Sequence, residues 1–117
     1  MYDVKPAIYS LLSSIPGVTV SDAYPDDWGK LPHISFYEAG NSDPLGVSGQ
    51  PKSDISIQID VWAKTSTGAL AAQVDTTMNS IGFRRTFASD VPDASGIKHK
   101  TMRYRGVVDV RFLRVHQ

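Results

Sequence analysis

Apolar and polar residues alternate strictly over residues 54–64, and this stretch gives the clearest structural signal in the chain. Side chains along a β-strand point to alternate faces, so the pattern predicts a strand with one buried face. Trp62 stands in the polar row although it is large and apolar, and we expect it to pack under a neighbouring strand, loop or subunit. The apolar row holds Ile55, Ile57, Ile59, Val61 and Ala63, and the polar row holds Ser56, Gln58, Asp60 and Trp62.

Two segments show the spacing of amphipathic helices. The first spans residues 3–15 and stops at Pro16 and Gly17. The second follows the N-cap candidates at positions 65–67 and runs to residue 81, where Gly82 ends it. The expected apolar stripes are Val4, Ile8, Leu11, Leu12 and Ile15 in the first helix, and Leu70, Val74, Thr77, Met78 and Ile81 in the second.

The remaining segments predict further strands and two loops. Residues 31–38 form a second strand, which we expect to pair antiparallel with residues 54–64 across a long loop at 39–53. That loop exceeds an ordinary hairpin connection, so it should be functional or disordered. Residues 18–20 and 83–87 predict short strands, and residues 88–96 a second loop.

Residues 97–115 predict one unusually long final strand. Gly106 marks an expected bend or bulge in it. Beyond this glycine, apolar residues occupy both faces of the strand, which predicts that the end of the chain is covered on both sides. Because a small monomer has little material for such covering, the pattern favours an oligomer contact.

These elements predict an α+β fold in a single domain covering residues 1–117. The sheet is expected to be antiparallel with about four strands, and the long loop separates its second and third strands. Each helix has one apolar stripe to bury, so we expect both helices on the same face of the sheet. The other face then remains for solvent or for a partner.

Composition excludes several functional classes. The 117 residues contain 12 Lys and Arg against 12 Asp and Glu, so no net field attracts the whole chain to nucleic acid or to an anionic membrane. There is no cysteine, hence no disulfide and no thiolate nucleophile. The N-terminus lacks the pattern of a signal peptide, and no apolar run reaches the roughly 20 residues that a membrane span needs. We therefore expect a non-membrane protein made in the cytoplasm.

Residue patterns for catalysis, cofactors and metals are missing from the sequence. The three histidines are scattered and have no acid at ligand spacing. No nucleophile elbow, dinucleotide fingerprint or phosphate loop occurs. We therefore expect no catalytic, cofactor-binding or metal-binding residue, and no enzymatic activity.

Four arginines are weak candidates for phosphate contacts. Arg84, Arg85, Arg103 and Arg105 would lie together if residues 83–87 pair with the final strand. Such a patch can hold phosphates, although arginines on an exposed sheet surface are more often solvated or paired across strands.

Several strings along the chain resemble one family of phage proteins. An N-terminal helix ends near I-P-G-V, L-P-H-I-S-F-Y-E precedes the long loop, and I-S-I-Q-I-D-V-W-A-K leads into T-S-T-G-A-L. M-N-S-I-G-F-R-R-T-F and K-H-K-T-M-R-Y-R-G-V-V-D follow. Together, over residues 4–109, they resemble the tail-completion proteins of long-tailed bacteriophages, which include tail-terminator and tail-to-head joining proteins.

The resemblance implies a structural virion protein at the head-proximal end of the tail. Proteins of this family form a homohexameric ring between the last ring of tail tube protein and the head connector, or neck protein, and double-stranded DNA passes through the lumen. A neck, connector or minor tail protein of the same assembly is an alternative interpretation. A nucleic-acid-binding accessory protein that uses the four arginines is another.

Partner contacts are expected in both loops, at the tryptophan and along the end of the last strand. The family implies the loop assignments by position only. The candidates are Asn41, Asp43, Leu45, Val47, Gln50, Trp62, Asp90, Val91, Asp93, Val107, Leu113 and Val115.

Overall fold

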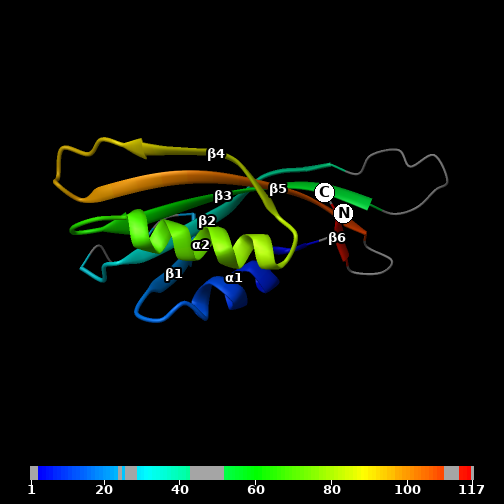
Figure 1. Cartoon of the computed structure of the whole chain (residues 1–117), viewed down its shortest axis with the longest axis horizontal. Helices are drawn as coiled ribbons and strands as arrows, with labels where there is room; N and C mark the ends of the chain where they lie inside the picture. Colours follow the sequence, from blue (N-terminus) through cyan, green and yellow to red (C-terminus); the bar gives the residue numbers. More distant parts are fainter. Residues whose placement is uncertain (1–2, 24, 26–28, 43–51, 110–113, 117) are drawn as a thin grey trace.

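A computed structural model describes residues 3–23, 25, 29–42, 52–109 and 114–116 of the chain. The elements are α1 (Lys5–Ser13), β1 (Thr19–Asp22), β2 (His33–Ser42), β3 (Lys52–Ala63), α2 (Gly68–Ser80), β4 (Arg84–Val91), β5 (Lys98–Asp109) and β6 (Arg114–His116). The strands lie in the order β1-β2-β3-β5-β4, and β6 pairs with the end of β5. Both helices cover one face of this sheet (Figure 1).

The predicted α+β arrangement of a sheet and two helices is confirmed, but the sheet is larger than expected and mixed. β1 runs parallel to β2, with Thr19 opposite His33, whereas the other strand pairs are antiparallel. β1 ends at Asp22, and β2 begins beside the first residue of β1, where the Thr19 N–H donates to the Pro32 carbonyl at 3.3 Å. A connection of this length permits a parallel return, which a two-residue hairpin turn does not.

The expected single final strand is wrong. β5 ends at Asp109, and β6 returns antiparallel to it, with Val107 opposite His116. Val107 and Val108 therefore belong to β5 and Val115 to β6, whereas Val110, Phe112 and Leu113 lie outside the described residues. The bulge expected at Gly106 is also absent, since the register between β3 and β5 is unbroken from Lys52 to Ala63.

Three strands extend into the predicted loops. β2 continues to Ser42 and β3 begins at Lys52, so the connection between them is shorter than residues 39–53. β4 likewise continues to Val91, although every one of its residues is exposed. Backbone pairing with β5, and not burial, sustains this strand, so alternating hydrophobicity underestimated its length.

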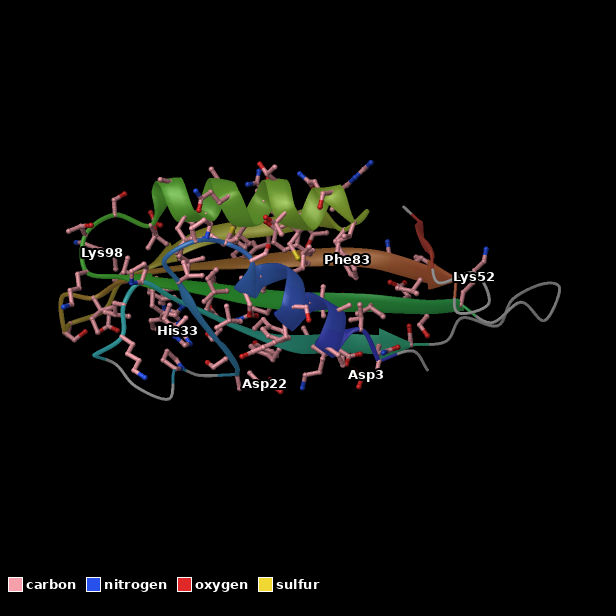
Figure 2. The ribbon with its side chains drawn as sticks, turned by 90° about the horizontal axis from the view of Figure 1, so that it is seen from below. Asp3, Asp22, His33, Lys52, Phe83 and Lys98 are labelled. Atoms are coloured by element: carbon pink, nitrogen blue, oxygen red, sulfur yellow. The ribbon has the colours of Figure 1, made fainter. Side chains whose placement is uncertain are left out.

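The core lies between the helices and the sheet (Figure 2). The odd-numbered row of β3 is buried as predicted, and Ile55, Ile57, Ile59 and Val61 have no exposed surface. The central part of each helical stripe meets them, through Ile8 and Leu12 of α1 and Val74 and Met78 of α2. The apolar patterns therefore located the core correctly.

Tyr104 joins β5 to α2 and makes stability sensitive to alkaline pH. Its ring is fully buried, and its hydroxyl donates to Asp75 Oδ1 at 2.8 Å. Burial, together with this hydrogen bond, raises the pKa of the phenol well above its usual value near 10. The folded chain thus keeps a proton that the unfolded chain loses above about pH 10, so this contribution to stability falls as the pH rises further.

Tyr104→Phe is expected to lower the free energy of unfolding by about 1 kcal/mol at pH 7. The difference between the wild type and this variant should then shrink above about pH 10, because the variant has no phenol to titrate. Urea unfolding followed by circular dichroism, at pH 7 and above about pH 10, measures this difference in the free energy of unfolding. Tyr9→Phe on the exposed surface of α1 is the control, and an unchanged difference at high pH would contradict the assigned role.

Candidate functional site

The sheet face that carries no helix is the candidate partner surface, and we call it the helix-free face. Residues opposite each other in the register lie on the same face of the sheet. Trp62 of β3 is opposite both His33 of β2 and His99 of β5, so all three residues lie on the helix-free face. The successive rows are Thr19, His33, Trp62, His99 and Val91; Ser21, Ser35, Asp60, Thr101 and Ser89; Tyr37, Gln58, Arg103 and Phe87; and Ser56, Arg105 and Arg84.

Trp62 is buried within its own chain. Its exposed fraction is 6%, its ring stacks on His99 with centroids 3.6 Å apart, and its Nε1–H donates to Ser35 Oγ at 3.0 Å. The predicted packing of Trp62 is therefore confirmed, and its described contacts are with neighbouring strands of the same sheet. Little of the ring remains for contact with a second chain.

A network of buried polar groups surrounds this tryptophan. Asp60 is buried, and its Oδ1 contacts His99 Nε2 at 2.7 Å, while Oδ2 accepts a bond from Gln58 at 3.3 Å. The ring of His33 lies between two hydroxyls, with Nε2 at 2.7 Å from Ser21 Oγ and Nδ1 against Thr19 Oγ1. Buried polar groups that bind one another in this way hold a surface rigid.

The network has the residue types of a hydrolytic triad, but its contacts between described residues do not form one. Ser21 contacts His33 through Nε2, and the Nδ1 of His33 meets the Thr19 hydroxyl. The buried carboxylate of Asp60 contacts His99. A serine nucleophile needs a base that an acid orients, and the contacts among the described residues do not join all three groups in either pair. Within the described residues, no group of three His, Asp or Glu side chains is placed to hold a metal ion.

The four arginines do not form one patch. Arg105 donates to both carboxylate oxygens of Asp54, at 2.9 and 2.5 Å, and these bonds raise the pKa of its guanidinium. Arg103 donates to Gln58 Oε1 at 2.8 Å. Arg84 lies opposite Arg105 on the helix-free face.

Arg85 differs from the other three because it points to the helix side of the sheet. It is opposite Tyr104 in the register, and its Nη1 lies 3.7 Å from Asp75 Oδ1 of α2. A single phosphate-binding cluster of all four arginines is therefore not assembled.

The described interface candidates separate to opposite ends of the sheet. Asn41 and Val107 are half-buried at the end where β2 finishes, near the start of β3. Asp90, Val91 and Asp93 are exposed at the other end, where Asp90 pairs with Lys100 at 3.2 Å. Asp43, Leu45, Val47, Gln50 and Leu113 lie outside the described residues, and Val115 is described only as part of the backbone of β6.

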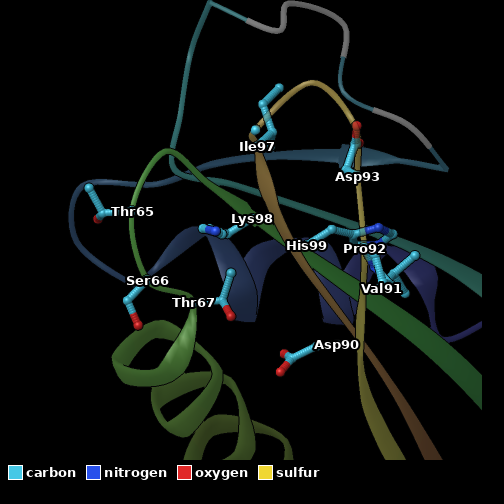
Figure 3. Close-up of a pocket in the computed structure, with 11 residues that line it drawn as sticks. Thr65, Ser66, Thr67, Asp90, Val91, Pro92, Asp93, Ile97, Lys98 and His99 are labelled. Atoms are coloured by element: carbon cyan, nitrogen blue, oxygen red, sulfur yellow. The ribbon is translucent and has the colours of Figure 1, made fainter.

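A cleft of about 560 Å³ opens beside the exposed end of β4. Figure 3 shows Thr65, Ser66 and Thr67 on one side of it and Val91, Pro92 and Asp93 on the other, with Lys98 between them. Residues 65–67 were identified from the sequence only as helix-capping candidates. Acidic, basic and apolar groups share the lining, so the cleft has no charge pattern that defines a cofactor.

Comparisons with protein-family models and with curated proteins give no match for this chain. In the described part of the chain, no helix has the length and apolar character needed to cross a membrane. Function has to be inferred from the surface of the sheet together with the family resemblance.

Proposed function

We propose that this chain is a structural protein of a bacteriophage virion, which caps the head-proximal end of the tail tube as a ring and joins the tail to the head connector. The observation that carries this proposal is the helix-free face of the sheet. Its central polar groups are occupied by one another, as in the contacts of Asp60 with His99 and of Trp62 with Ser35. A rigid, polar sheet surface of this kind suits protein contacts better than chemistry.

The strings behind the resemblance correspond to central elements of the fold. L-P-H-I-S-F-Y-E leads into β2, I-S-I-Q-I-D-V-W-A-K forms most of β3, and K-H-K-T-M-R-Y-R-G-V-V-D forms β5. These three strands are neighbours in the sheet. The resemblance therefore concerns one contiguous scaffold and not scattered peptides, which supports a shared architecture.

The arginine contacts favour passage of DNA over tight binding of DNA. Protein cations gain affinity for DNA when they replace condensed counterions at the phosphates. Arg105 is held by Asp54 and Arg103 by Gln58, so both would have to give up contacts within the chain first. Together with zero net charge, these contacts support a ring that DNA traverses, and they give less support to an accessory nucleic-acid-binding protein.

Deletion of the gene from the phage tests the proposal. Electron microscopy of the lysate is expected to show filled heads and separate tails, because the joint between them is missing. A plasmid copy of the wild-type gene should restore joined virions, which is the control. Normal virions from the deletion phage would contradict the proposal.

Tail length in the same lysate separates this proposal from the neck-protein alternative. A protein that caps the tube is expected to be needed for a defined tube length, so tails should vary in length without it. Tails of uniform, normal length with unattached heads would instead favour a neck or connector protein.

A further inference from the structure

β4 forms an open edge of the sheet. It is last in the strand order and pairs only with β5 among the described residues. All eight of its residues are exposed. Two of them are large apolar residues, Phe87 with an exposed fraction of 55% and Val91 with 37%. Figure 1 shows β4 along the border of the sheet, with no other labelled element beyond it.

The two halves of β4 differ in how the edge is protected. In the first half, the register shifts between Arg85 and Phe87, and Thr86 is the extra residue. Bulges and charged side chains of this kind usually block pairing at an edge. The second half, residues 87–91, continues in regular register with β5 and carries one charge, Asp90, which Lys100 of β5 already neutralises at 3.2 Å.

We propose that residues 87–91 of two copies of this chain pair antiparallel, about a two-fold axis at Ser89. Such pairing sets Phe87 opposite Val91 of the second copy, and Val91 opposite its Phe87. Both side chains lie on the helix-free face, because Phe87 is opposite Arg103 and Val91 opposite His99 in the register of β5. The two exposed apolar groups of each chain then cover those of the other.

The remaining positions are compatible with the same axis. Ala88 meets Asp90 of the second copy, and Ser89 meets its own counterpart, so no like charges face each other. Aromatic and β-branched pairs across strands contribute roughly 0.2–1 kcal/mol each, and the symmetry provides two of them. The strand is short, so the contact should fall below the roughly 1,200 Å² of stable interfaces and give a weak, reversible dimer.

This contact is independent of the proposed ring. A two-fold contact joins a surface to itself and closes at two copies, whereas a ring needs two different surfaces on each subunit. Isolated protein is sufficient to test it, and its failure would leave the ring proposal untouched.

Ser89→Cys provides the test, because the chain contains no other cysteine. Opposed residues of antiparallel strands have Cα atoms about 4.5–5.5 Å apart, within the range of a disulfide. Under mild oxidation the variant is expected to form a covalent dimer several-fold faster than Ser95→Cys. Ser95 is an exposed residue of the connection between β4 and β5. The two-fold axis would place the Ser95 residues of the two copies at opposite ends of the paired strands.

A second substitution tests the apolar pair. Phe87→Lys combined with Ser89→Cys should reduce the rate of cross-linking to that of Ser95→Cys, since the lysine removes the aromatic contact and charges the edge. Tyr9→Lys combined with Ser89→Cys is the control, because Tyr9 is an exposed aromatic residue of α1, away from β4, and this variant should cross-link as fast as Ser89→Cys alone. Equal rates for Ser89→Cys and Ser95→Cys, or insensitivity to Phe87→Lys, would overturn the proposal.

Discussion

Ile57→Ala is expected to lower the free energy of unfolding by about 2–5 kcal/mol. Ile57 lies in the middle of β3, the central strand, and its side chain has no exposed surface. The substitution loses the transfer energy of the removed carbons and leaves a cavity where the helices meet the sheet. Urea unfolding followed by circular dichroism measures the loss.

Ser56→Ala is the matched control for this substitution. Ser56 precedes Ile57 in the same strand but belongs to the helix-free face and is only half-buried. Its replacement should change the free energy of unfolding by less than about 0.5 kcal/mol. Similar losses for both variants would show that the two faces of β3 are not distinguished by burial.

Trp62→Ala is expected to cost about 3–5 kcal/mol, although the residue lies on the face without helices. The ring covers His99 at a centroid distance of 3.6 Å and donates to Ser35, which is fully buried. Its loss opens a cavity and admits water to the buried contact of Asp60 with His99. Thermal and urea unfolding measure the effect, and a loss below about 1 kcal/mol would contradict the packing described for this ring.

Trp62→Phe separates the ring from the hydrogen bond. Phenylalanine keeps an aromatic ring beside His99 but offers no N–H to Ser35 Oγ, so a smaller loss of about 1–3 kcal/mol is expected. Adding Ser35→Ala should recover part of that loss, because the buried hydroxyl without its donor is then removed as well. If the second substitution only adds to the loss, the bond between Trp62 and Ser35 does not stabilise the fold.

Ile57 and Trp62 lie on opposite faces of β3, and the sequence identified only the face of Ile57 as buried. Alternation along β3 predicted the buried isoleucines directly, because strand geometry alone sends them to one side. The same alternation placed Asp60 and Trp62 in a polar row, whereas both are 6% exposed. The large size of Trp62 predicted that its ring is covered, whereas the sequence did not predict the burial of Asp60.

The polar network itself left no trace in the sequence. His33, Asp60 and His99 are separated by 27 and 39 residues, so no spacing rule relates them. Both histidines flank Trp62 because β3 lies between β2 and β5, and the same register brings Asp60 to His99. A single sequence without the strand register cannot supply that neighbourhood. The division of the four arginines between two faces depends on the same register and on the bulge in β4.

The sequence by itself determined the α+β class, the two helices, the buried row of β3 and its antiparallel pairing with β2, because these follow from periodicity and from contacts close along the chain. The tertiary structure alone decided the parallel pairing of β1, the return of β6, the extent of β4 and the contacts on the helix-free face. Those features depend on which strands become neighbours. That choice is made by the packing of the whole sheet under its helices, and local side-chain patterns do not encode it.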